Sequence, residues 1–171
     1  MTSLSPSAPT DLTTDRLVLH PWTMADATAV LTGTGTAHWA DDFPADGDLV
    51  IAGLFDQHPA WLGEYGHRLI IERDSSVVVG SIGLFWPPHA GALEIGYGIV
   101  ASRRGRGYAP EATRALAEFA LTAPGVHTVF AHVELSNPAS VRVLEKAGFH
   151  RWAITDGTAR FEITGPDHQM R

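Results

Sequence analysis

The chain has 171 residues, of which 44% are apolar and 18% are charged. This length and apolar content predict one globular domain with a single core, and they exclude disorder of the whole chain. Twelve Lys and Arg residues against 19 Asp and Glu give a net charge of -7, which argues against a general nucleic-acid-binding protein. The absence of cysteine excludes disulfides, thiolate metal sites and cysteine nucleophiles.

The first ten residues are rich in Ser, Pro and Thr, and they predict a flexible tail before a single domain over residues 11–171. They have neither the basic region nor the apolar region of a secretory signal. No apolar run in the chain is long enough to span a bilayer. We therefore expect a cytoplasmic protein with no membrane partner.

Apolar spacing and turn residues predict the elements in chain order. The predicted strands span 16–20, 69–72, 77–85, 92–100, 126–135 and both arms of a hairpin over 151–164 that turns at Asp156-Gly157. The predicted helices span 24–31, 48–65, 111–121 and 138–147. Thr23 is expected to cap the first helix, and Pro59 interrupts the second. The three strands between 69 and 100 predict an antiparallel meander.

A glycine-rich loop, RRGRGYA, stands between a predicted strand and a predicted helix over residues 103–109. Glycines allow a tight turn whose backbone N–H groups face one point, and the helix N-terminus adds its dipole. This arrangement can hold phosphate groups. It does not match a Walker loop, because Tyr108 follows Gly107, and Pro110 and the antiparallel setting do not match a Rossmann loop. The alternative is a solvated Arg-rich turn.

Four segments in the correct order resemble the GNAT superfamily of acyl-CoA-dependent N-acetyltransferases. Arg104-x-x-Gly107-x-Ala109 is similar to its Gln/Arg-x-x-Gly-x-Gly/Ala signature, and Asn137-Pro138-Ala139-Ser140 with the run 143–149 resembles the segment after its fifth strand. Residues 93–99 look like the family's fourth strand. Residues 14–19 resemble the N-terminal segment that is usual in one branch of the family. The resemblance covers about residues 12–164. It implies an α+β fold with a single mixed, mostly antiparallel sheet of about seven strands and about four helices.

The resemblance also narrows the branch of the family. Many of these enzymes have a tyrosine seven residues after the Asn, where it protonates the departing thiolate. Leu144 stands at that position, and Ser140 stands where such enzymes often have Ala. This combination resembles the RimJ/RimL-like, ribosomal-protein N-terminal acetyltransferase branch, which contains proteins with many acceptors.

The resemblance implies acetyl-CoA as co-substrate and places its pantetheine arm beside Ile99 and Val100, where an N–H would polarise the carbonyl. It places the pyrophosphate on the N–H groups of residues 105–109. The implied cofactor-binding residues are Ile99, Val100, Arg104, Gly105, Arg106, Gly107, Tyr108, Ala109, Asn137 and Ser140.

Glu94 is the candidate general base. In a strand Glu94, Gly96 and Gly98 share one face, which leaves open space beside a carboxylate. Glu94 could take the amine's proton through water, or it could simply pair with an arginine. Ser140 is the candidate acid or hydrogen-bond donor to the sulfur, and the alternative is a residue that caps its own helix turn.

The nine histidines have no zinc-site spacing, so no metal is expected. His67 could approach the acceptor but is more typical of a surface residue. Trp22, Trp39, Trp61 and Trp86 could line part of an acceptor pocket. The sequence thus predicts transfer of an acetyl group to a primary amine, on a protein N-terminus or a small molecule, and it is compatible with a homodimer. A non-catalytic acyl-CoA-binding module and an antibiotic-modifying enzyme remain as alternatives.

Overall fold

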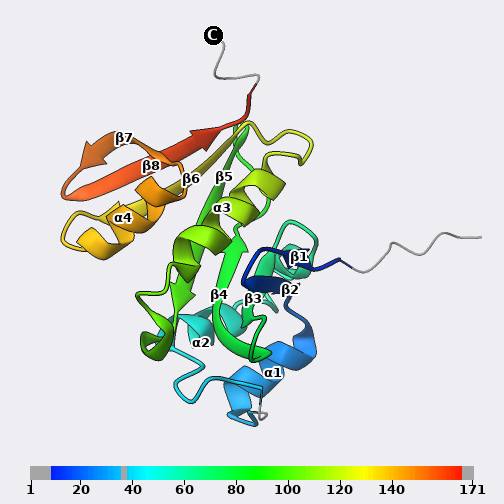
Figure 1. The fold of residues 1–171 in the computed structure, drawn as a ribbon. Coiled ribbons are helices and arrows are strands. Elements are labelled where there is room, and N and C mark those ends of the chain that lie inside the picture. The colour runs from blue at the N-terminus through cyan, green and yellow to red at the C-terminus, as the bar shows by residue number, and fades with distance from the viewer. Residues whose placement is uncertain (1–8, 36–37, 167–171) are drawn as a thin grey trace, which may run out of the picture.

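The computed structural model describes residues 9–35 and 38–166 as one sheet with helices on both faces (Figure 1). The strands are β1 (Leu12–Thr13), β2 (Leu17–Pro21), β3 (His67–Glu72), β4 (Val77–Leu84), β5 (Ala92–Ile99), β6 (Thr128–Glu134), β7 (His150–Thr155) and β8 (Thr158–Thr164). The helices are α1 (Met24–Thr32), α2 (Asp46–Ala52), α3 (Tyr108–Ala120) and α4 (Pro138–Lys146). Residues 1–8 of the predicted tail and 167–171 of the predicted domain lie outside the described residues.

The strands follow the order β1-β2-β3-β4-β5-β6-β8-β7 across the sheet. Each neighbouring pair is antiparallel except β5 and β6, which are parallel and are connected through α3. A parallel pair needs such a crossover connection. The predicted α+β architecture with a mostly antiparallel sheet is confirmed. The sheet has eight strands because Leu12–Thr13 adds a short edge strand against β2.

The central strands β5 and β6 separate part-way along their length. Only Ala92–Glu94 of β5 pairs with Thr128–Phe130 of β6, although both strands continue beyond these residues. In Figure 1 the two halves of the sheet diverge from this point, with α3 running along β5 and α4 beside β6 and β8. Among the described residues, no strand pairs with β5 from Ile95 to Ile99 on its β6 side. The edge of a strand is therefore open in the middle of the sheet.

The two faces of β5 meet different helices. Tyr97 pairs with Ile82 of β4, which in turn pairs with Arg68, and the Arg68 guanidinium lies over Phe119 of α3. Gly98 pairs with Ser81, whose hydroxyl donates to Asp48 of α2. Tyr97 therefore faces the α3 side of the sheet, whereas Gly98 faces the α2 side.

The predicted helices agree with the structure except for the second. Thr23 caps α1 with a capping box to Asp26, as expected. The helix predicted over 48–65 is wrong, because α2 ends at Ala52 before Gly53 and only a 3-10 turn, Pro59–Leu62, follows. Gly and Pro both disfavour a helix interior, and together they divide this segment.

Candidate active site

A cavity of about 500 Å³ opens where β5 separates from β6, and we call it the loop cavity. It lies between the end of β5, the glycine-rich loop, the N-terminus of α3 and the side of α4 whose lining residues include Ser140, Arg142 and Lys146. The predicted cofactor-binding residues that line it are Ile99, Arg104, Gly105, Gly107, Tyr108, Ala109, Asn137 and Ser140. The structure thus brings together residues that lie up to 41 positions apart in the chain.

The glycine-rich loop has the backbone conformation that its sequence predicts. Gly105 and Gly107 have φ angles of 79° and 81°, in the left-handed region that glycine adopts readily. Gly107 is the N-cap of α3 and provides no side chain to occupy the free N–H groups of the first turn. Those N–H groups remain available to a phosphate.

Two of the predicted cofactor-binding residues, Val100 and Arg106, make contacts outside the loop cavity. The Val100 N–H donates to the Val79 carbonyl at 2.9 Å, so it already has a partner in β4. An Arg106 Nη atom lies 3.4 Å from a Glu72 oxygen, and the Arg106 side chain does not line the cavity. Arg142 and Lys146 of α4, which were not predicted from the sequence, line the cavity with Arg103 and Arg104. Helical spacing from Ala139 could have identified them, because Arg142 and Lys146 follow it by three and seven residues.

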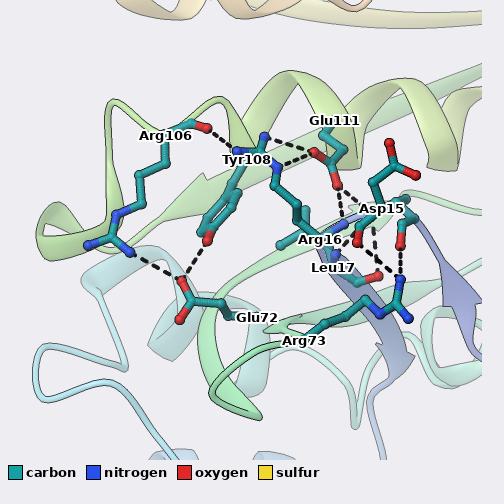
Figure 2. A network of polar contacts seen from close by, with 9 residues as sticks. Asp15, Arg16, Leu17, Glu72, Arg73, Arg106, Tyr108 and Glu111 are labelled. Carbon is teal, nitrogen blue, oxygen red and sulfur yellow. Dashed lines mark hydrogen bonds and ion pairs between the residues drawn. The ribbon is translucent and has the colours of Figure 1, made fainter.

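A network of charged side chains holds the glycine-rich loop in place (Figure 2). Arg16 bonds to Glu111 through Nε at 2.8 Å and donates to the Arg106 carbonyl at 2.6 Å. Burial alone would raise the pKa of Glu111, but hydrogen bonds from Thr14 and Arg16 hold it below its usual value. The carboxylate therefore stays charged, and strand β2 is tied to the loop.

Glu72 makes the second connection in Figure 2. Its carboxylate accepts a 2.6 Å hydrogen bond from the Tyr108 hydroxyl and faces Arg106. Arg103, which the figure does not draw, lies 3.6 Å from the same carboxylate. The hydrogen bond from Tyr108, followed by one from Ser75, lowers the Glu72 pKa below its usual value. Tyr108 and the two arginines are thus held around one buried carboxylate.

Ser140 stands at the start of α4, where the Asn137 side chain caps the helix by accepting the Ser140 N–H at 3.3 Å. The Ser140 hydroxyl does not cap this turn. It lies 2.6 Å from the Tyr97 hydroxyl of β5, across the space between the two halves of the sheet. Sequence reasoning missed Tyr97, because the partners are 43 residues apart.

A second cavity of about 460 Å³ lies on the α2 side of the sheet, and we call it the α2 cavity. Ser81, Gly83, Gly96 and Gly98 are among the sheet residues that line it. The space over Gly98 is open, whereas the His67 ring fills the space over Gly83. It shares Tyr97, Gly98, Ile99 and Arg104 with the loop cavity. The two cavities therefore adjoin at the end of β5, one on each face.

Two buried titratable groups line the α2 cavity. Asp48 accepts hydrogen bonds from Ser81 and from the Ala45 N–H, and burial raises its pKa above the usual value despite both bonds. His67 is 3% exposed, and burial lowers its pKa to about 4, so the ring is neutral at pH 7. His67 is therefore not the surface residue that the sequence suggested. No sequence signal pointed to Asp48.

Glu94 lines a third cavity with Phe130, Arg160 and Glu162. One of its oxygens lies 3.4 Å from His132 Nδ1, and its side chain is 40% exposed. Phe85 lines this cavity and the α2 cavity, and its ring would lie 3.2 Å from a Cβ at Gly96. Glu94, Gly96 and Gly98 share one face of β5 as expected, but Phe85 covers Gly96, so the face is not open along its whole length.

Trp22 packs against Phe55, Trp39 packs against Phe43, and none of the four predicted tryptophans lines these three cavities. Trp61 Nε1 donates to the Trp86 carbonyl. The described residues hold no group of three His, Asp or Glu side chains that could bind a metal ion. Within residues 9–35 and 38–166, no helix has the length and apolar character needed to cross a bilayer. The cytoplasmic location and the homodimer remain predictions.

Comparison with known proteins decides the family. A family model described as an acetyltransferase (GNAT) domain matches residues 16–150. The chain belongs to the GNAT acetyltransferase family. A curated relative, "Probable N-acetyltransferase YjcK" of Bacillus subtilis, is 34% identical over 107 residues, which are 61% of this chain and 59% of the relative. The chain spans between 49% and 59% of the length of the curated relatives that it matches.

Solved structures support the GNAT fold. A Vibrio cholerae protein described as a candidate ribosomal-protein-serine acetyltransferase matches with a TM-score of 0.66 and 19% identity, over 93% of this chain and 100% of that one. A dodecameric Vibrio cholerae spermidine N-acetyltransferase matches with a TM-score of 0.63 and 16% identity, over 91% and 97% of the two chains. At these identities the likeness concerns the fold alone.

Proposed function

We propose that this chain transfers an acetyl group from acetyl-CoA to a primary amine by direct attack in a ternary complex. One observation carries the proposal: the loop cavity and the α2 cavity meet at Tyr97, Gly98 and Ile99, on opposite faces of the sheet. Acetyl-CoA supplies an activated thioester. At this meeting point, a thioester bound in the loop cavity would be within reach of an amine that enters through the α2 cavity.

The loop cavity fits coenzyme A in shape and charge. Beyond Glu94, no strand among the described residues pairs with this edge of β5, which can bond an extended amide chain as a neighbouring strand would. The Ile99 carbonyl is already taken, because it accepts a hydrogen bond from Arg104 Nε at 3.0 Å. The N-terminus of α3 and the side chains of Arg103, Arg104, Arg142 and Lys146 provide positive charge in a chain whose net charge is -7. Pyrophosphate binding at residues 105–109 is the part of the proposal that these features support.

The acceptor that we propose is a primary amine, either a protein N-terminus or a small molecule such as an antibiotic. Ser140 and Leu144 support the RimJ/RimL-like branch, in which acceptors vary. The two Vibrio cholerae neighbours also differ in the acceptor for which they are named, a ribosomal-protein serine and spermidine. Gly98 leaves room for an acceptor in the α2 cavity, because a Cβ at this position would meet no atom within 4 Å.

A thiol-release assay with acetyl-CoA across a panel of amines and peptides tests this function. We expect free coenzyme A only when an amine is present, together with the acetylated amine in equal amount. Thermal stabilisation by acetyl-CoA without thiol release from any acceptor would instead identify a non-catalytic acyl-CoA-binding module. Neither stabilisation nor release would exclude both functions.

Glu94→Gln tests the proposed base. It removes the proton acceptor with little change in shape, so we expect kcat/KM for the amine to fall about 100-fold, the lower end for a positioned base. The effect should be largest below the acceptor's pKa, with acetyl-CoA affinity unchanged. Glu118→Gln, on the exposed side of α3, is the matched control.

A different result for Glu94→Gln would assign the role of general base to another residue. Glu94 is four residues before Gly98, or roughly 13 Å along the strand, so it would have to act through water. Asp48 lines the α2 cavity directly. A normal rate for Glu94→Gln with a large loss for Asp48→Asn would assign proton removal to Asp48 and contradict the role of Glu94.

A further inference from the structure

The proposed reaction needs a proton at the sulfur, and Leu144 of α4 cannot provide one. Leu144 is apolar, 1% exposed and directed into the core, so its position contributes nothing to the loop cavity. A thiol has a pKa of about 8.5, so at neutral pH the departing sulfur ends mostly protonated. A nearby hydroxyl group could supply that proton as the bond to sulfur breaks.

Two hydroxyl groups meet at the required place. Tyr97 Oη lies 2.6 Å from Ser140 Oγ and 3.3 Å from the Ser140 carbonyl oxygen, and its one hydrogen can be donated to either. The pair bridges β5 and α4 across the opening between β5 and β6, and both residues line the loop cavity. Tyr97 also lines the α2 cavity, so the residue lies where the two proposed substrate cavities adjoin.

We infer that Tyr97 is the source of the proton that the departing thiolate takes up, passed through or together with the Ser140 hydroxyl. This inference rests on the proposed acetyl transfer. The amine nitrogen forms a bond to the carbonyl carbon, and the bond between that carbon and sulfur breaks with its electron pair on sulfur. Sulfur takes a proton from the hydroxyl pair. The amine nitrogen loses a proton to the base, and that proton returns through water to Tyr97. The products are an amide and a thiol, and both side chains are regenerated.

The chemistry of the two hydroxyl groups assigns the proton to Tyr97. A tyrosine hydroxyl ordinarily has a pKa of about 10, within two units of a thiol, whereas a serine hydroxyl is far less acidic. Burial raises the pKa of Tyr97, and the hydrogen bond with Ser140 opposes this, so the phenol carries its proton at neutral pH. Ser140 by itself is too weak an acid, but it can pass on a proton that Tyr97 replaces.

Tyr97→Phe tests the inference, because it removes one oxygen atom and keeps the ring. We expect kcat with acetyl-CoA to fall at least about 100-fold, while KM for acetyl-CoA and its thermal stabilisation stay within twofold of wild type. Tyr65→Phe is the matched control, since Tyr65 stacks between Trp86 and Phe119 away from both cavities, and it should keep wild-type kcat.

Ser140→Ala and the double variant complete the test. Ser140→Ala should lower kcat about 10-fold, because Tyr97 can still reach the sulfur through a water molecule. Since the two groups act on one proton, the double variant should be no more than about threefold slower than Tyr97→Phe alone. Additive losses would overturn the shared path.

The remaining outcomes separate this inference from the proposed function. Wild-type turnover with an unchanged kcat for Tyr97→Phe overturns the role of Tyr97 and leaves acetyl transfer intact. A loss of kcat together with the loss of thermal stabilisation by acetyl-CoA shows that Tyr97 only shapes the cavity, and it also overturns the inference. No thiol release by the wild-type protein with any acceptor overturns both.

Discussion

Ala109→Glu is expected to abolish the stabilisation of this protein by acetyl-CoA. Ala109 lies in the first turn of α3 and lines the loop cavity, where the pyrophosphate is proposed to bind. A carboxylate there would repel the phosphate groups and occupy their space. The same carboxylate favours the N-terminus of a helix, so the variant should fold normally.

Thermal unfolding measures this effect. At 100 times its Kd, acetyl-CoA should stabilise the wild-type protein by about 2.7 kcal/mol, or about 5–10 °C in Tm for a domain of this size. Ala109→Gln, of similar size but neutral, should retain part of the shift, and the difference between the two variants reports the charge. A full shift in Ala109→Glu would exclude the loop as the phosphate site.

Gly107 is a poorer position for this test, although it is central to the loop. Its φ is 81°, a backbone conformation that side chains other than glycine rarely adopt. A Cβ at this position would lie 3.2 Å from Arg16 Nη2, within the network that holds the loop. Loss of binding in Gly107→Glu would therefore combine repulsion of the ligand with damage to the loop.

Gly98→Leu is expected to lower kcat/KM by more than 100-fold without loss of stability. A Cβ built at Gly98 meets no atom within 4 Å, and its backbone is not in the left-handed region. Leucine would therefore fold without strain and fill the space where the two cavities meet. Strand residues other than glycine also lose less entropy on folding, so Tm should be equal or slightly higher.

A graded series makes this test quantitative. Gly98→Ala, Gly98→Val and Gly98→Leu should reduce kcat/KM in that order, since each adds volume at the place of reaction. Circular dichroism and Tm provide the control for folding. Full activity in the leucine variant would show that substrates do not meet at Gly98, and it would contradict the ternary arrangement.

The sequence by itself determined the features that depend on neighbouring residues. Thr23 and Asp26 specify the start of α1, and Asn137 with Pro138 specifies the start of α4. The hairpin turn at Asp156-Gly157 has positive φ at both residues, as this pair predicts. The glycine-rich loop before α3 could be recognised in the same way, because its conformation follows from its own glycines.

Tertiary structure alone decided which distant groups meet at the site. Tyr97 and Ser140 come together because β5 and β6 separate after Glu94, and no local pattern encodes where two strands part. Arg106 faces Glu72, 34 residues earlier, although the loop sequence suggested that it was free for a ligand.

For the same reason, Asp48 could not be predicted as a site residue, because its partner Ser81 is 33 residues later in the chain. The alternation of side chains along β5 could be read from the sequence, but which helix covers each face could not. That choice depends on how α2 and α3 pack against the completed sheet, so only the folded chain shows that the two faces of β5 open into two adjoining cavities.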